Sequence, residues 1–167
     1  MSSSTSISDR RPSRLVSGVA AAAPVLAAAV LGSFATTPNI PWYDTLAKPP
    51  LNPPNWVFGP AWTTLYVLMA YAFYRILRLE PATPGRRAAI IVFFAQLVLN
   101  AAWSFAFFSA QSPQLGLVVI LPMAALLVAT IVLFWRLDRV AGYFLAPTAF
   151  WVAFATYLNA GIFVLNS

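Results

Sequence analysis

The chain has 167 residues, of which 60% are hydrophobic and 8% are charged, and its formal net charge is +6. This composition is too apolar for a water-soluble domain and indicates a protein whose surface mostly faces lipid. Cys and His are absent from the sequence, which excludes disulfides, thiolate or imidazole catalysis and the usual transition-metal ligands. We therefore expect no metal site and no cofactor.

The N-terminal region divides into a polar tail and a first apolar run. Residues 1–14 are rich in Ser and Arg and are predicted to be disordered, whereas residues 15–167 form the membrane domain. The run at about 15–36 also resembles a signal peptide, with Ser33 and Ala35 placed as at a cleavage site. It is longer than the usual run of about 7–15 residues, which favours a retained helix.

Four more apolar runs follow, at about 56–74, 88–110, 114–135 and 140–165. Each run can cross a hydrocarbon core of about 30 Å as a helix. Strands of a membrane barrel would alternate apolar and polar residues, whereas these runs are continuous and rich in Leu, Ala and Val. The predicted fold is an all-α membrane protein with five transmembrane helices. Prolines inside three of the runs are tolerated in membrane bundles and are expected to kink their helices, namely Pro24, Pro122 and Pro147.

The basic residues predict an orientation. Every arginine precedes the first run, flanks the turn between the second and third runs, or lies between the fourth and fifth, whereas the single lysine, Lys48, lies on the opposite side. The positive-inside rule then predicts a cytoplasmic N-terminus, as in a bacterial inner membrane, with the outer membrane as the open alternative. Because these arginines flank membrane helices instead of forming a stripe on a soluble face, nucleic acid is not an expected partner.

The segment between the first two helices has an unusual composition. Residues 42–62 read WYDTLAKPPLNPPNWVFGPAW, with three Trp and five Pro. Fixed backbone angles and large flat side chains predict a stiff, aromatic loop that covers an internal pocket.

Polar and aromatic residues also recur at helical spacing inside the apolar runs. Residues at this spacing share one face of a helix, and three such faces could line one cavity. Their members are Trp62 and Tyr66 in the second run, Gln96, Asn100 and Trp103 in the third, and Thr148, Trp151, Ala155 and Asn159 in the fifth. The alternative for Gln96 and Asn100 is hydrogen bonding between helices. The alternative for the tryptophans is anchoring at the membrane interface, which we adopt for Trp135. The four acidic residues lie in the tail or in loops, so an ion-coupled pump is not expected.

Several of these segments, in this order, resemble the TspO/MBR family of tryptophan-rich sensory proteins, translocator proteins and peripheral-type benzodiazepine receptors. They are WYDTLAKPPLNPPNWVFGPAW, QLVLNAAWSFAFF (96–108), LDRVAGYFLAP (137–147) and FWVAFATYLN (150–159). The resemblance covers nearly everything after residue 15. It implies a five-helix membrane protein, commonly a homodimer, that binds tetrapyrroles such as protoporphyrin IX, other lipophilic molecules and membrane lipid.

The resemblance also implies ligand contacts, at Tyr43, Pro53, Trp62, Tyr66, Asn100, Trp103, Trp151 and Ala155, to which the helical face adds Gln96. Receptor or carrier is the function it favours. The alternatives are a regulatory subunit of a membrane complex and a light- and oxygen-dependent porphyrin-degrading enzyme that uses Trp62 and Trp151. Thr148 stands where many members have Tyr, and the sterol-recognition pattern of animal members lacks its basic residue after Tyr157, which makes sterol the less expected ligand.

Overall fold

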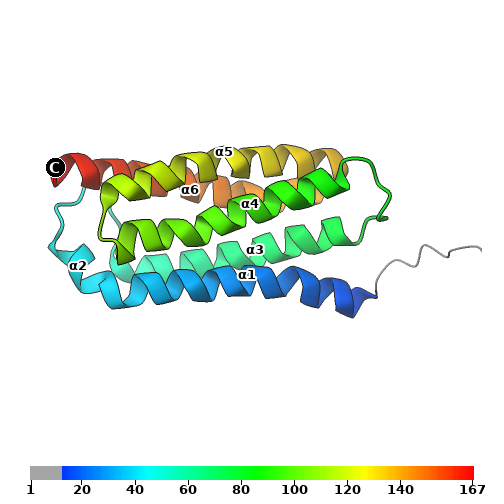
Figure 1. Ribbon diagram of the computed structural model, residues 1–167, viewed down its shortest axis with the longest axis horizontal. Coiled ribbons are helices and arrows are strands. Elements are labelled where there is room, and N and C mark those ends of the chain that lie inside the picture. Colours follow the sequence, from blue (N-terminus) through cyan, green and yellow to red (C-terminus); the bar gives the residue numbers. More distant parts are fainter. Residues whose placement is uncertain (1–12) are drawn as a thin grey trace, which may run out of the picture.

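Long antiparallel helices follow one another along the chain and lie side by side in an elongated bundle (Figure 1). The computed structural model describes residues 13–167. The long helices are α1 (Arg14–Thr36), α3 (Phe58–Leu77), α4 (Arg86–Ser104), α5 (Pro113–Leu137) and α6 (Arg139–Leu165). The prediction of an all-helical chain is confirmed over this range. The predicted disordered tail lies outside the described residues, apart from Ser13 and Arg14, which already belong to the start of α1.

Within residues 13–167, four helical segments are long and apolar enough to cross a membrane, namely Arg14–Thr45, Arg86–Ser109, Pro113–Leu137 and Arg139–Leu165. The chain is therefore an integral, multi-pass membrane protein. The remaining predicted transmembrane helix corresponds to α3. Its 20 residues include two threonines, three tyrosines and, near its end, Arg75. These polar groups lower its hydropathy, but α3 runs beside α1 along the length of the bundle (Figure 1).

Side chains define where the helices begin. The Ser13 hydroxyl accepts a hydrogen bond from the Val16 amide at 3.2 Å, and the Ser112 hydroxyl accepts one from Leu115 at 3.2 Å. The Asp138 carboxylate accepts from the amides of the second and third residues of α6. Such caps satisfy amides that have no partner within the helix. They explain why α5 and α6 can follow one another with a single residue between them.

The chain deviates from a regular α-helix at one place inside the bundle. After Ser104, the backbone of α4 continues as a π-helix over Phe105–Ser109, where the Ala110 amide donates to the Phe105 carbonyl at 2.8 Å. The predicted helix over 88–110 thus has two parts. The three internal prolines are found inside α1, α5 and α6, and each helix continues through its proline.

The five long helices form a closed ring. Helix α1 packs against α3 and α4, α5 packs against α4 and α6, and α6 packs against α3. In the half of the ring near the arginines, the centre is filled by stacked phenylalanines. Ring centroids of Phe73 and Phe93 lie 4.3 Å apart, and those of Phe93 and Phe134 lie 5.7 Å apart. All three side chains are fully buried.

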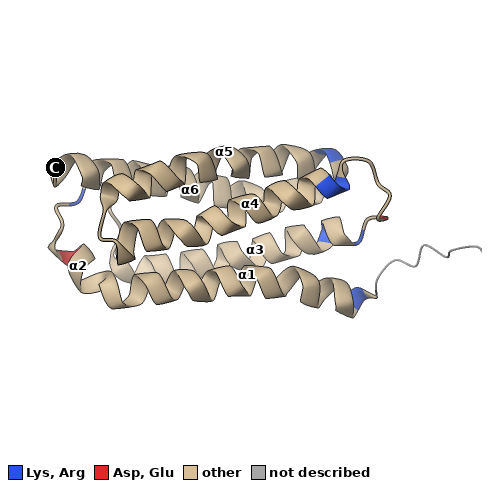
Figure 2. Cartoon of the chain, in the orientation of Figure 1, with Lys and Arg blue, Asp and Glu red and all other residues tan. Residues whose placement is uncertain are grey.

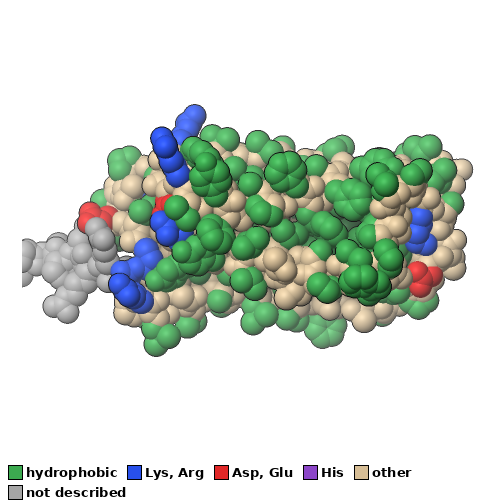
Figure 3. Space-filling view, turned by 180° about the vertical axis from the view of Figure 1, so that it is seen from behind, with side chains coloured by type: hydrophobic (Ala, Val, Ile, Leu, Met, Phe, Trp, Pro, Cys, Tyr) green, Lys and Arg blue, Asp and Glu red, His purple; other side chains and the backbone are tan. Residues whose placement is uncertain are grey.

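Charged residues lie at the two ends of the bundle, and apolar side chains cover most of the face between them (Figures 2 and 3). At the end where α3 finishes and α6 begins, the Arg75 guanidinium donates to the Asp138 carboxylate at 2.8 Å. Arg86 donates to the carbonyls of Ile76 and Leu77, the last residues of α3. These contacts join the ends of α3, α4 and α6.

At the other end, residues 37–57 connect α1 to α3. This connecting segment contains a 3-10 turn (Thr37–Asn39), the short helix α2 (Ile40–Thr45), an extended part rich in proline, and a second 3-10 turn (Asn55–Val57). Lys48 lies here, far along the bundle from the arginines of the helix ends (Figure 2). The segment lies at the end of the bundle opposite to the stacked rings of Phe73, Phe93 and Phe134.

Candidate ligand-binding site

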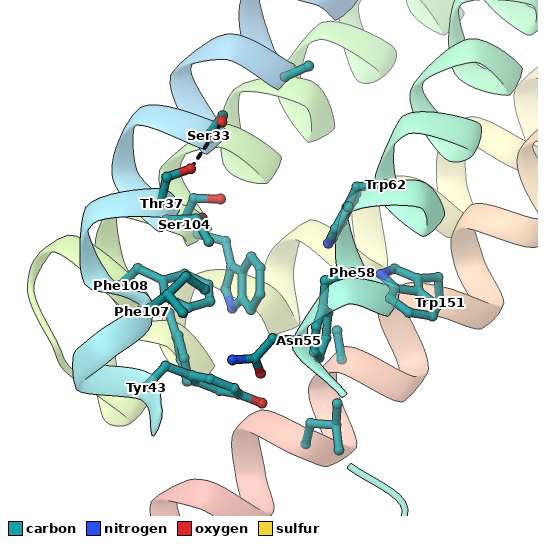
Figure 4. A pocket seen from close by; sticks show the side chains of 18 of the residues that line it. Ser33, Thr37, Tyr43, Asn55, Phe58, Trp62, Ser104, Phe107, Phe108 and Trp151 are labelled. Carbon is teal, nitrogen blue, oxygen red and sulfur yellow. Dashed lines mark hydrogen bonds between the residues drawn. The ribbon is translucent and has the colours of Figure 1, made fainter. Parts of the chain in front are cut away.

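A cavity of about 340 Å³ lies inside the ring, between the connecting segment and the middle of the bundle (Figure 4). Its volume falls within the range of about 300–1,000 Å³ that is usual for small-molecule sites. Every long helix except α5 contributes to its wall, as does the connecting segment. No Asp, Glu, Lys or Arg belongs to the lining, so the cavity is suited to binding an uncharged surface rather than to acid–base chemistry.

Tryptophans and tyrosines form one side of the cavity. Trp62 on α3 lies between Tyr66 and Trp103, with ring centroids 5.6 Å and 6.3 Å away and planes tilted by 31° and 34°. Trp151 on α6 meets Trp62 edge-on, at 6.5 Å and 85°. Rings in these arrangements leave faces and edges available to a flat apolar ligand.

The two deeper indoles differ in their hydrogen bonding. The Trp103 N–H donates to Asn159 Oδ1 at 3.1 Å, and Asn159 in turn donates to the Pro113 carbonyl at 2.7 Å. The Trp151 N–H is buried and has no partner among the described residues. Because a buried donor normally finds an acceptor, the Trp151 N–H, unlike that of Trp103, has a hydrogen bond left to offer to a bound molecule.

Trp151 also lines a second, shallow groove on the outside of the bundle. This outer groove runs between α3 and α6 and includes Thr64, Tyr143 and Phe150. The indole of Trp151 thus separates the internal cavity from the face that meets lipid.

Tyr43, in helix α2 of the connecting segment, forms one end of the cavity. Its side chain is 4% exposed, and its hydroxyl donates to Asn52 Oδ1 at 2.7 Å. The Lys48 ammonium lies 4.8 Å from the centre of its ring, a distance at which a cation and an aromatic ring attract each other. Asn55 donates to the Asp44 carboxylate at 2.7 Å. Contacts within the segment therefore fix the position of Tyr43.

The connecting segment is attached to the last turns of α6. Asn166 accepts a hydrogen bond from the Ala47 amide at 3.0 Å and donates to the Ala47 carbonyl at 2.9 Å. The Tyr157 hydroxyl donates to the Pro50 carbonyl at 2.9 Å. Pro49 packs directly on Gly161, where any Cβ would lie 2.6 Å from the proline ring. The C-terminal part of α6 thus holds the segment over the cavity.

The side of the cavity formed by α1 is polar. Hydroxyl groups line it from three helices and from the start of the connecting segment, at Ser33, Thr36, Thr37, Thr63 and Ser104. Figure 4 shows Ser33, Thr37 and Ser104 grouped across the cavity from Trp62 and Trp151. The cavity therefore has an aromatic wall and a hydroxyl wall.

Most of the residues selected from the sequence lie around this cavity. Its lining includes Tyr43, Trp62, Tyr66, Trp103, Trp151, Ala155 and Asn159. Four selected residues lie outside the lining. Asn100 is buried behind Tyr66, whose hydroxyl donates to Asn100 Oδ1 at 2.7 Å, so this amide joins α3 to α4. Gln96 and Thr148 are buried in the bundle, and Pro53 accepts a hydrogen bond from Asn52 in the connecting segment.

Sequence reasoning missed two groups of lining residues. The first is the hydroxyl wall on α1, although Ser33 and Thr37 are conspicuous as polar residues at helical spacing near the end of an Ala-rich run. The second is the pair Phe107 and Phe108, which are 2% and 9% exposed and both line the cavity. Both lie in the π-helical turn Phe105–Ser109, a departure from α-helical geometry that a spacing of 3.6 residues does not predict.

The chain is similar in sequence to known proteins over most of its length. The sequence profile described as the TspO/MBR family matches residues 20–165. The chain is 39% identical over 142 residues to "Tryptophan-rich protein TspO" of Chlorobaculum tepidum, covering 84% of this chain and 90% of that protein. It is 40% identical over 125 residues to "Tryptophan-rich sensory protein" of Cereibacter sphaeroides, covering 75% and 77%. It is 36% identical over 138 residues to the human "Translocator protein", covering 82% of each.

Proposed function

This chain belongs to the TspO/MBR family, and we propose from that premise that it is a membrane receptor or carrier for tetrapyrroles such as protoporphyrin IX. The names of its relatives, sensory protein and translocator protein, favour a sensory or translocator role in the membrane. In our proposal, a flat lipophilic ligand occupies the internal cavity and the connecting segment acts as its lid.

The observation that carries this proposal is the aromatic wall. The rings of Tyr66 and Trp103 lie tilted at 5.6 Å and 6.3 Å from the ring of Trp62, and Trp151 adds a buried N–H that has no partner within residues 13–167. A planar, conjugated macrocycle offers both a large face to these rings and nitrogen or oxygen acceptors to the indole. Small polar solutes would leave most of this wall without contacts.

Titration of the purified protein in detergent or nanodiscs with protoporphyrin IX tests the proposal. We expect saturable quenching of tryptophan fluorescence and weaker binding by Trp151→Phe, which keeps an aromatic ring but removes the N–H. Loss of one neutral hydrogen bond corresponds to about 0.5–1.5 kcal/mol, or roughly twofold to tenfold in Kd. Trp135→Phe, at the arginine end of α5 and outside the cavity, is the matched control. Wild-type protein that shows no saturable binding would refute the proposed function.

A second candidate function is light- and oxygen-dependent breakdown of the bound porphyrin. It is favoured by the edge-on contact of Trp62 and Trp151, because a bound photosensitiser would lie directly against two oxidisable indoles. Illumination of the complex in air distinguishes the two functions. Several turnovers per protein, lost in Trp62→Phe and Trp151→Phe, would support an enzyme, whereas products that form as fast from free porphyrin would support a receptor or carrier. A regulatory role through a partner in the membrane would be seen by affinity capture.

We also propose that the arginine end faces the cytoplasm, in a bacterial inner membrane, and that the chain forms homodimers. The orientation rests on the arginines at one end of the bundle. Because the chain has no cysteine, single cysteines at Ala82 and Ala47, both exposed and at opposite ends, can be labelled with a membrane-impermeant reagent in spheroplasts. Labelling of Ala82→Cys but not Ala47→Cys would contradict the orientation, and a monomer in native membrane extracts would contradict the dimer.

A further inference from the structure

The side chains of the hydroxyl wall can form more hydrogen bonds than they form within the bundle. Ser33 and Thr37 share one hydrogen bond at 3.3 Å, and Thr63 donates to the Gly59 carbonyl one turn earlier in α3. Thr36 and Ser104 have no hydrogen-bond partner within residues 13–167, although both line the cavity. Since every hydroxyl has one donor and two acceptor positions, most of this capacity is unused.

Ser104 is the most informative member of the wall. It is 7% exposed, and buried hydroxyl groups normally have a partner. A Cβ at Gly32 would lie 3.2 Å from its oxygen, so the absence of a side chain at Gly32 leaves room for the Ser104 hydroxyl between α1 and α4. A hydroxyl kept in this position has a donor free for a molecule inside the cavity.

The hydroxyl wall lies where the cavity reaches the surface. Ser33, Thr37, Gly59 and Thr63 are exposed and also line the cavity, whereas Tyr43, Trp103 and Phe107 opposite are buried. A Cβ at Gly59 would have no atom within 4 Å. The exposed residues belong to the end of α1 and the start of α3, so the cavity opens between these two helices, beside the connecting segment.

We propose that this hydroxyl wall is a subsite for the carboxylate edge of a planar amphiphilic ligand, whose apolar face lies against the tryptophans. The proposal deepens the proposed function and rests on it. Hydroxyl donors form their strongest hydrogen bonds with ionised acceptors, and the position at the opening leaves the carboxylate in contact with water and headgroups, so that no buried cation is needed. Recognition of this edge would also orient the ligand, with its carboxylates between α1 and α3.

Two ligands that differ only at this edge test the subsite, namely protoporphyrin IX and its dimethyl ester. Both are titrated against wild-type protein, Ser104→Ala, Thr37→Val and the two changes combined. We expect the double variant to bind the diacid about fivefold to tenfold more weakly and the ester less than about twofold more weakly, because hydroxyl bonds to a charged acceptor contribute more.

Thr64→Val is the matched control. Thr64 follows Thr63 in α3 and makes the same kind of hydrogen bond to a preceding carbonyl at 2.9 Å, but it lines the outer groove. We expect it to bind both ligands as the wild type does. If the double variant unfolds, Ser33→Ala, at an exposed position, replaces it. Equal loss for diacid and ester would overturn the subsite and leave the proposed function intact, whereas wild-type protein that binds neither ligand would refute both.

Discussion

The contact between Gly161 and Pro49 allows a direct test of how the connecting segment is held over the cavity. In Gly161→Ala, the new Cβ would lie 2.6 Å from Pro49 Cβ and 2.7 Å from its Cγ. Carbon atoms in ordinary contact are about 3.5–4.0 Å apart, so the segment and α6 must separate by about 1 Å. A proline ring cannot rotate out of the way, and the backbone of the segment must therefore move.

The size of the effect follows from this overlap. Inserting a methyl group into a filled contact costs about 1–3 kcal/mol. The cost falls only on the state in which the segment is closed, because an open segment no longer touches Gly161. The ratio of open to closed molecules should therefore rise by roughly 5–150-fold. The two hydrogen bonds between Asn166 and Ala47, and the one that Tyr157 donates to Pro50, oppose this opening in the wild type.

Hydrogen exchange of the Ala47 amide in lipid nanodiscs measures the opening, because this amide donates to Asn166 only while the segment is closed. We expect faster exchange by the same factor in Gly161→Ala, together with faster dissociation of bound protoporphyrin IX. Gly18→Ala is the control, since a Cβ there meets no atom within 4 Å and both variants gain about 1 kcal/mol of helix propensity. Unchanged exchange at Ala47, with a lower unfolding temperature, would mean that α6 deforms instead and would refute this reasoning.

Three further predictions concern the helix ends, the indole partner and the opening. Asp138→Ala removes the cap of α6 and should destabilise the protein by about 0.5–2 kcal/mol in thermal unfolding. Asp138→Asn should cost no more than about 1 kcal/mol, because it keeps a capping oxygen and loses only a partly exposed ion pair with Arg75. Equal destabilisation by the two variants would contradict the view that the cap contributes more than the ion pair. Asn159→Leu leaves the Trp103 N–H without its acceptor and should cost about 1–3 kcal/mol in the same assay, and an unchanged midpoint would contradict the assignment. Gly59→Leu places a side chain in the opening and should slow association and dissociation of protoporphyrin IX in stopped-flow fluorescence while Kd stays within about twofold; rates equal to those of Gly18→Leu would show that the ligand uses another path.

The helices were predictable because each helix that crosses a membrane needs about 20 consecutive, mostly apolar residues. Long uncharged runs separated by arginines, by the Pro/Trp segment or by the short polar stretch before Pro113 predict the number of helices and their alternating course. The order of the helices around the ring was not predictable in this way. Helix α3 packs against α1 and α6 far more than against α4, its successor in the chain, and only the matching of side chains between helices decides this.

The aromatic part of the site was predictable from helical spacing, since Trp62 and Tyr66, or Trp151 and Ala155, occupy one face of a regular helix. Spacing could not tell which polar residues on those faces reach the cavity. Asn100 is covered by Tyr66 and bonds to it, so that the alternative of a hydrogen bond between helices holds for this amide. Nor could spacing predict Phe108, which lies in the π-helical turn, where the α-helical repeat does not apply.

The stacked phenylalanines of the arginine end have a consequence for transport. Phe73, Phe93 and Phe134 fill the centre of the ring beyond the floor of the cavity, so the cavity is a dead end and not a segment of a pore. A molecule bound there can leave only on the side from which it came, unless these three rings separate. Exchange of ligand with one leaflet therefore needs no more than local motion, whereas passage across the bilayer would require the bundle to open along its axis or to hand the molecule to a second protein.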